Sequence, residues 1–136
     1  MGRLSGKVAI VTGGSAGLGR ADALALANAG AKVVVTDINQ AEGAKVAAEI
    51  NALHPGAALF LAQDVRSESR WQEVIAETVR TFGGLHVLVN NAGVVKIATP
   101  ESCTLEEFQF QNAVMSEGVF LGCKHAIPAL KTSGGG

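Results

Sequence analysis

The chain has 136 residues, of which 48% are hydrophobic, 11 are basic and 12 are acidic, so its formal net charge is −1. This size suits one globular domain with a substantial core, and the charge balance argues against a nucleic-acid partner, which needs a basic surface. No apolar run approaches the roughly 18 residues of a membrane helix, and the two cysteines show no disulfide pattern, which favours a reducing cytoplasm.

A glycine-rich stretch at residues 12–19, Thr-Gly-Gly-Ser-Ala-Gly-Leu-Gly, follows an apolar run rich in β-branched residues. The run predicts a strand over residues 7–12, and the helix formers after the glycines predict a helix over residues 17–29. At such a turn the first N–H groups of the helix lack internal partners and attract a phosphate. Gly13 then takes the turn conformation, Gly17 lets the backbone approach the phosphate, and Gly19 lets the helix pack near the sheet. On the glycines alone, an ordinary tight turn is the alternative.

The second predicted strand, residues 31–37, ends in Asp37. An acidic residue at this place, roughly 20 residues past the glycines, binds the ribose hydroxyls of a dinucleotide. Its carboxylate repels the additional 2′-phosphate of NADP, and residues 36–40 contain no Arg or Lys, while Ala16 stands just before the second motif glycine. The sequence therefore predicts NAD as the cofactor.

The middle of the chain continues the alternation of helix and strand. A helix is predicted over residues 40–53, a strand over residues 57–62, a helix from the N-cap Ser67 to Phe82, and a strand over residues 85–89. The narrow apolar face of the first of these helices is expected to consist of Ala44, Ala47, Ala48 and Leu53.

The last third of the chain predicts one long helix over residues 105–130. Thr104 and Glu107 have the form of a capping box at its start. Pro128 predicts a kink or a stop near its end. Residues 132–136, which end in three glycines, are expected to form a flexible tail.

The alternation of apolar strands with helices predicts an α/β fold, a Rossmann doubly wound parallel sheet covered by helices on both faces. The expected strand order is 3-2-1-4, which places the fourth strand at an edge. We expect a single domain over residues 1–136 that is truncated before the later strands of such a sheet.

Several motifs occur together in the order and spacing of a known family: the glycines at 13, 17 and 19, Asp37, Asp64-Val65, and Asn-Asn-Ala-Gly at residues 90–93. The chain resembles the N-terminal half of a short-chain dehydrogenase/reductase. The resemblance implies an NAD(P) cofactor, hydride transfer between an alcohol and a carbonyl compound, a small-molecule alcohol or ketone as substrate, and a homo-oligomer formed through the long helix region. No metal is implied. The implied cofactor-binding residues are Gly13, Ser15, Ala16, Gly17, Leu18, Gly19, Asp37, Ile38, Asp64, Val65, Asn91, Ala92 and Gly93, with Asp64 bonded to the adenine.

Two departures from the family pattern bear on activity. The family's catalytic Tyr-x-x-x-Lys lies beyond residue 136, and the chain contains no tyrosine, so these 136 residues are expected to be inactive alone. Met115 stands where the family usually has an Asn that orders a water chain, which Met cannot do. We therefore expect the cofactor-binding half of an NAD-dependent enzyme. The alternatives are a nucleotide-binding module without chemistry and a structural fragment with an unformed site. The apolar edge strand and long helix predict that the chain self-associates or is marginally stable.

Overall fold

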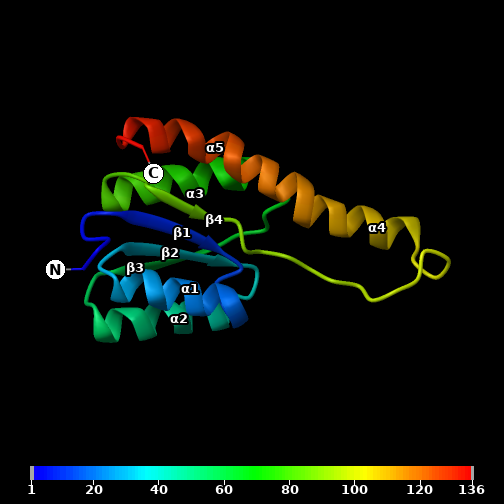
Figure 1. The fold of residues 1–136 in the computed structure, drawn as a ribbon, viewed down its shortest axis with the longest axis horizontal. Helices are drawn as coiled ribbons and strands as arrows, with labels where there is room; N and C mark the ends of the chain where they lie inside the picture. Colours follow the sequence, from blue (N-terminus) through cyan, green and yellow to red (C-terminus); the bar gives the residue numbers. More distant parts are fainter. Residues whose placement is uncertain (1, 136) are drawn as a thin grey trace.

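Four parallel strands form one sheet in the order β3-β2-β1-β4 in the computed structural model, which describes residues 2–135 (Figure 1). In chain order the strands are β1 Val8–Thr12, β2 Lys32–Asp37, β3 Ala58–Ala62 and β4 Val87–Val89. At the centre of the sheet, Ile10 of β1 is in register with Val34 on one side and Leu88 on the other. The predicted α/β fold and the 3-2-1-4 order, with the fourth strand at an edge, are confirmed.

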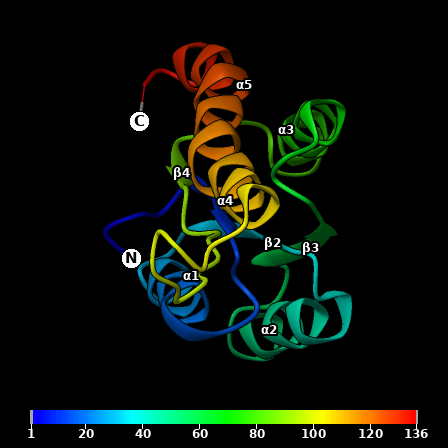
Figure 2. The same ribbon diagram turned by 90° about the vertical axis from the view of Figure 1, so that its right-hand side faces the viewer.

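Helices cover both faces of the sheet, as Figure 2 shows. Helices α1 (Gly17–Asn28) and α2 (Gln40–Leu53) pack on one face, and α3 (Glu68–Phe82) and α5 (Gly118–Thr132) pack on the other. Every residue of β1 is buried, because a central parallel strand has helices on both sides. This double burial explains the unbroken apolar run that predicted the strand.

Strand β4 is shorter than the predicted residues 85–89. The ring Nδ1 of His86 accepts a hydrogen bond from the backbone N–H of Val8 at 3.0 Å. A side chain therefore takes the place of a strand carbonyl, and regular pairing begins at Val87.

The apolar face of α2 differs from the expected one. The buried residues of the helix are Gly43, Val46, Ala47 and Ile50. The prediction was wrong for Ala44, Ala48 and Leu53, the last of which is 63% exposed. Val46 and Ile50 are larger than alanine and lie one turn apart, so burying them removes more apolar surface from water. Gly43 belongs to this face because the Phe60 ring lies against it, where a Cβ would come within 2.1 Å.

The long helical region is not one regular helix. It consists of α4 (Leu105–Asn112), a π-helical turn η1 (Ala113–Glu117) and α5. In the π-helical turn, the Gly118 N–H bonds to the Ala113 carbonyl five residues back, which inserts one residue relative to an α-helix. Residues 94–112, here called the projecting arm, comprise an extended segment and α4 and reach beyond the sheet (Figure 1).

The expected end of this region also needs correction. Pro128 lies inside α5, which continues to Thr132. The proline removes one backbone hydrogen bond, the one that its own N–H would have donated. The Thr132 hydroxyl donates to the Pro128 carbonyl at 3.0 Å. Ser133, expected in a flexible tail, accepts a hydrogen bond from the Leu85 N–H at 3.0 Å. Residue 136 of the expected tail lies outside the described residues. Within residues 2–135, no helix combines the length and apolar character of a membrane span.

Candidate functional site

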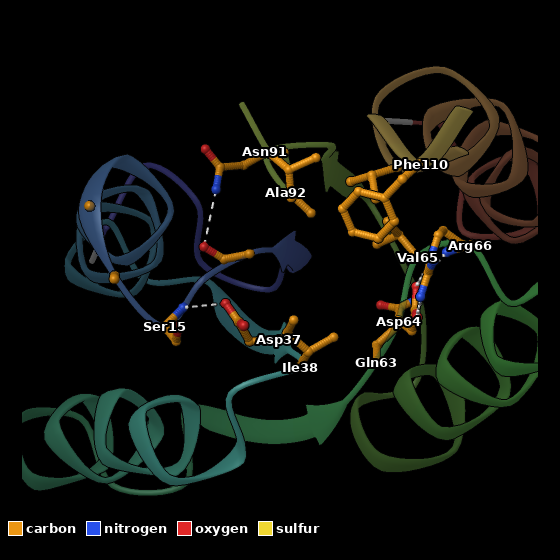
Figure 3. A pocket seen from close by; sticks show the side chains of 16 residues that line it. Ser15, Asp37, Ile38, Gln63, Asp64, Val65, Arg66, Asn91, Ala92 and Phe110 are labelled. Atoms are coloured by element: carbon orange, nitrogen blue, oxygen red, sulfur yellow. Dashed lines mark hydrogen bonds and ion pairs between the residues drawn. The ribbon is translucent and has the colours of Figure 1, made fainter. Parts of the chain in front are cut away.

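A cavity of about 390 Å³ lies where the strands end at their carboxyl sides (Figure 3). Parallel α/β sheets bind ligands at this edge. All of the predicted cofactor-binding residues line it except Leu18 and Gly19. The Leu18 side chain is 78% exposed on α1. Gly19 is buried, and a Cβ there would stand 2.3 Å from the Gly13 carbonyl oxygen, so this glycine permits the close packing that its position predicted.

The glycine turn is clamped by the segment that follows β4. The Asn91 side-chain amide donates to the carbonyls of Thr12 and Gly13, both at 3.1 Å. The Thr12 hydroxyl accepts from the backbone N–H groups of Asn91 at 3.1 Å and Ala92 at 3.0 Å. Gly13 has a φ of +63°, as its predicted turn role requires, and a Cβ there would stand 2.8 Å from the Ala92 Cα. These contacts hold the turn in one conformation.

The start of α1 leaves its N–H groups free at the cavity. The first helical bond runs from Arg20 N to Ala16 O, so the N–H groups of residues 17–19 have no helical acceptor. Helices α2, α3 and α4 start with side-chain caps, whereas the N-cap of α1, Ala16, has no side-chain oxygen and no acidic residue follows in the first turn. Gly17 has a φ of +56°, and nothing lies within 4 Å of where its Cβ would be. The positive end of the helix dipole therefore has room for an anion such as a phosphate.

Asp37 lies beside this turn at the end of β2. One carboxylate oxygen accepts from the Ser15 N–H at 3.2 Å (Figure 3). The other accepts from the Asn39 N–H at 3.0 Å. Because a carboxylate oxygen has two lone pairs, each can accept one more hydrogen bond. The carboxylate is thus held in place with acceptor capacity for a pair of hydroxyl groups.

The far end of the cavity is formed by the residues after β3. Asp64 and Arg66 form an ion pair, with Nη2 of Arg66 2.6 Å from Oδ2 of Asp64. The hydrogen bond from the Arg66 side chain holds the pKa of the Asp64 carboxyl below its ordinary value. The Arg66 guanidinium also lies over the Phe110 ring, 4.9 Å from its centroid, which is a cation–π geometry. This arrangement joins the strand end to α4.

Five lining residues were not among those predicted from the sequence: Gln63, Arg66, Val94, Phe110 and Val114. Gln63 had a detectable signal, since it is a polar residue at a strand end directly before Asp64. Phe110 had none, because its approach depends on how α4 is oriented relative to the sheet.

Met115 lies in the π-helical turn and does not line the cavity. Its side chain is 54% exposed, and its Cε lies 3.8 Å from where a Cβ on Gly93 would stand. It is therefore close to the segment that clamps the glycine turn. The suggested correspondence with the water-ordering Asn stays a prediction.

Known proteins resemble the chain over nearly its whole length. A family model described as short chain dehydrogenase matches residues 7–136. The chain is 43% identical over 133 residues to a 3-beta-hydroxysteroid dehydrogenase of Comamonas testosteroni, a match that covers 98% of the chain and 51% of the relative. It is 45% identical over 134 residues to a 2,5-dichloro-2,5-cyclohexadiene-1,4-diol dehydrogenase of Sphingobium indicum, covering 98% and 53%. A crystal structure of a short-chain type dehydrogenase/reductase from Mycobacterium marinum superposes with a TM-score of 0.91 at 36% identity, covering 96% of this chain and 53% of that one. The chain spans about half the length of the curated relatives it matches.

Proposed function

The chain belongs to the short chain dehydrogenase family, and we propose that it is the cofactor-binding half of an NAD-dependent oxidoreductase. The bound nicotinamide would supply or accept the hydride that is exchanged between an alcohol and a carbonyl compound. Two of the relatives are named as dehydrogenases of a hydroxysteroid and of a cyclic diol. These names favour a secondary or cyclic alcohol, or its ketone, as the substrate class.

The observation that carries the proposal is the placement of Asp37. Its two carboxylate oxygens are fixed by the N–H groups of Ser15 and Asn39, and Asp37 lines a cavity that the N-terminus of α1 also borders. Phosphates at the helix start and ribose hydroxyls at the carboxylate are the two contacts that such a fold uses for a dinucleotide. The free N–H groups, the open space at Gly17 and the unused acceptor capacity of Asp37 fit that ligand.

The same carboxylate favours NAD over NADP. A 2′-phosphate would stand beside it, and like charges at about 4 Å repel by a few kcal/mol at intermediate dielectric. Among the described residues that line the cavity, the only basic side chain is Arg66, and Asp64 already pairs with it. The cavity therefore offers no uncommitted cation to a second phosphate.

The proton chemistry of the reaction belongs to residues that this chain does not contain. It has no tyrosine, so we expect these 136 residues to bind the dinucleotide without turnover. A non-catalytic nucleotide-binding module is the second candidate, which the absence of tyrosine and the predicted correspondence of Met115 with the usual Asn both favour. We also propose that copies associate through the long helix region, where Phe108 and Phe120 are 56% and 63% exposed. The cytoplasmic location stays a prediction.

Fluorescence titration of the chain with NADH and NADPH tests the cofactor proposal. We expect NADH to bind at least about tenfold more tightly. Asp37→Ala should weaken NADH binding and reduce the difference in affinity between NADH and NADPH. Glu101→Ala is the control, because this exposed carboxylate does not line the cavity, and it should change neither affinity. Tighter binding of NADPH by the unmodified chain would contradict the proposal.

A further inference from the structure

Trp71 is the only tryptophan of the chain, and it lies near the start of α3 with 0% of the residue exposed. It does not line the cavity. Its indole N–H nevertheless donates to the backbone carbonyl of Val65 at 2.8 Å, and Val65 belongs to the cavity wall. A buried indole N–H needs an acceptor, and here the acceptor lies in the segment that follows β3.

The peptide between Val65 and Arg66 is hydrogen-bonded at both of its polar atoms. Its carbonyl accepts from the Trp71 indole, and its N–H, which belongs to Arg66, donates to Oδ1 of Asp64 at 3.0 Å. Because a peptide is planar, neither polar atom can turn without the other. Linked hydrogen bonds of this kind also polarise one another. The indole therefore acts, through one rigid peptide, on the hydrogen bond that orients the Asp64 carboxylate.

Two glycines of α5 hold the ring and the cavity wall in place from behind. A Cβ on Gly118 would stand 2.8 Å from Cγ2 of Val65, and a Cβ on Gly122 would stand 2.9 Å from Cη2 of Trp71. The missing side chains thus let α5 come close to both residues. The ring has no room to withdraw toward α5, so the indole N–H stays in reach of the Val65 carbonyl.

Asp64 lies at the end of the cavity to which the base of a dinucleotide would extend. Phosphates at the start of α1 and a ribose at Asp37 direct the base past Ile38. Figure 3 shows Asp37 and Ile38 on one side of the hollow and Asp64 on the other. The 6-amino group of adenine is a donor, and a carboxylate is a complementary acceptor. The Arg66 side chain, which also bonds to Asp64, is 42% exposed and so has room to move aside for the base.

We propose that Trp71 is a positioning residue for the base of the cofactor. Through the peptide between Val65 and Arg66, its indole N–H holds the Asp64 carboxylate in the orientation that accepts from the 6-amino group of adenine. Trp71 acts only through these residues, since it does not line the cavity itself. The inference rests on the proposed function, because it assumes that the cavity binds a dinucleotide.

Two variants remove the indole N–H in different ways. Trp71→Phe keeps an aromatic ring in the core but leaves the buried Val65 carbonyl without its partner, so the variant should be less stable than the unmodified chain. Replacement of Trp71 by β-(3-benzothienyl)alanine, in which sulfur takes the place of the N–H, removes the same donor at nearly constant volume. This second variant provides the test if Trp71→Phe does not fold.

Val74→Ala is the matched control for a loss of stability. Val74 is 0% exposed, lies in the same helix as Trp71 and packs in the same core. Its truncation leaves a cavity and should lower the melting temperature. It breaks none of the hydrogen bonds that link Trp71 to Asp64, so the affinity of the folded variant for the ligand should be unchanged.

Calorimetric titration with ADP-ribose, and with an analogue that carries hydrogen in place of the 6-amino group, tests the inference at a temperature where each variant is folded. The unmodified chain and Val74→Ala should bind ADP-ribose about tenfold more tightly than the analogue. Both Trp71 variants should bind ADP-ribose about fivefold more weakly than the unmodified chain and should bind the analogue as it does. Their preference for the 6-amino group should therefore nearly disappear.

A purely structural role of Trp71 would weaken the binding of both ligands equally, and that result would overturn the inference. So would an unchanged affinity of the Trp71 variants for ADP-ribose, or equal binding of the two ligands by the unmodified chain. In each of these cases the unmodified chain still binds ADP-ribose, and the proposed function stands. If the unmodified chain binds neither ADP-ribose nor NADH, the proposed function fails and the inference fails with it.

Discussion

Helix α2 and helix α4 are both well capped, but only α2 buries a side of itself. Asn39 caps α2, whose buried face includes Val46 and Ile50. Thr104 and Glu107 form a complete capping box at the start of α4, yet none of the residues of α4 is buried. Caps satisfy the N–H groups of the first turn and so determine where a helix begins. They do not provide a partner for its apolar side.

The projecting arm exposes large apolar side chains, whereas the side of the sheet that α1 and α2 cover does not. Ile97 is 93% exposed and Phe108 is 56% exposed, whereas the core between α1, α2 and the sheet is closed. Polar contacts of Lys96 hold the arm together. Its side-chain Nζ lies 3.1 Å from a Glu107 carboxylate oxygen, and its backbone N–H donates to Oε1 of Gln111 at 3.1 Å. Large exposed apolar side chains that gather on one surface mark interaction sites, so the arm is where we expect association to occur.

The largest expected effect is on the closed side. Ile50→Ala removes a 0% exposed side chain from the core around α2 and should lower the free energy of unfolding by about 2–5 kcal/mol. Phe108→Ala in the arm should change it by less than about 0.5 kcal/mol, as surface substitutions do. Urea denaturation followed by circular dichroism measures both variants. Equal losses of stability would mean that the arm packs against the domain in solution.

The second effect concerns association. If a second copy covers the arm, the average mass of the unmodified chain should rise with concentration in light scattering. Phe108→Ser should raise the dissociation constant about tenfold, because it removes a large part of the apolar surface of the arm. Leu53→Ser is the control, since Leu53 is 63% exposed but lies at the end of α2. The prediction is wrong if the unmodified chain stays monomeric at all concentrations.

The elements that the sequence predicted correctly are those with local signals. The caps Ser67 and Thr104 and the unbroken apolar strands located the helices and the sheet, and the glycine spacing located the turn at Gly13. What the sequence did not show depends on contacts between distant segments. The approach of Phe110 to Arg66 follows from the orientation of α4, and the π-helical turn at residues 113–117 has no spacing signal that distinguishes it from an α-helix.

The smallest expected effect comes from removing an N-cap hydroxyl, and it should differ between a helix that packs on the core and one that does not. The Ser67 hydroxyl accepts from Arg70 N at 3.2 Å at the start of α3, which buries Trp71 and Val74. Ser67→Ala should lower the free energy of global unfolding by about 1 kcal/mol, because α3 cannot unfold without opening the core. Thr104→Ala removes a cap of the same kind from a helix that buries nothing, so α4 should fray locally while the urea midpoint stays constant. Hydrogen exchange should show faster exchange confined to the amides of α4. A drop in the urea midpoint of Thr104→Ala equal to that of Ser67→Ala would show that α4 unfolds together with the core, and that its exposed side is coupled to the rest of the domain.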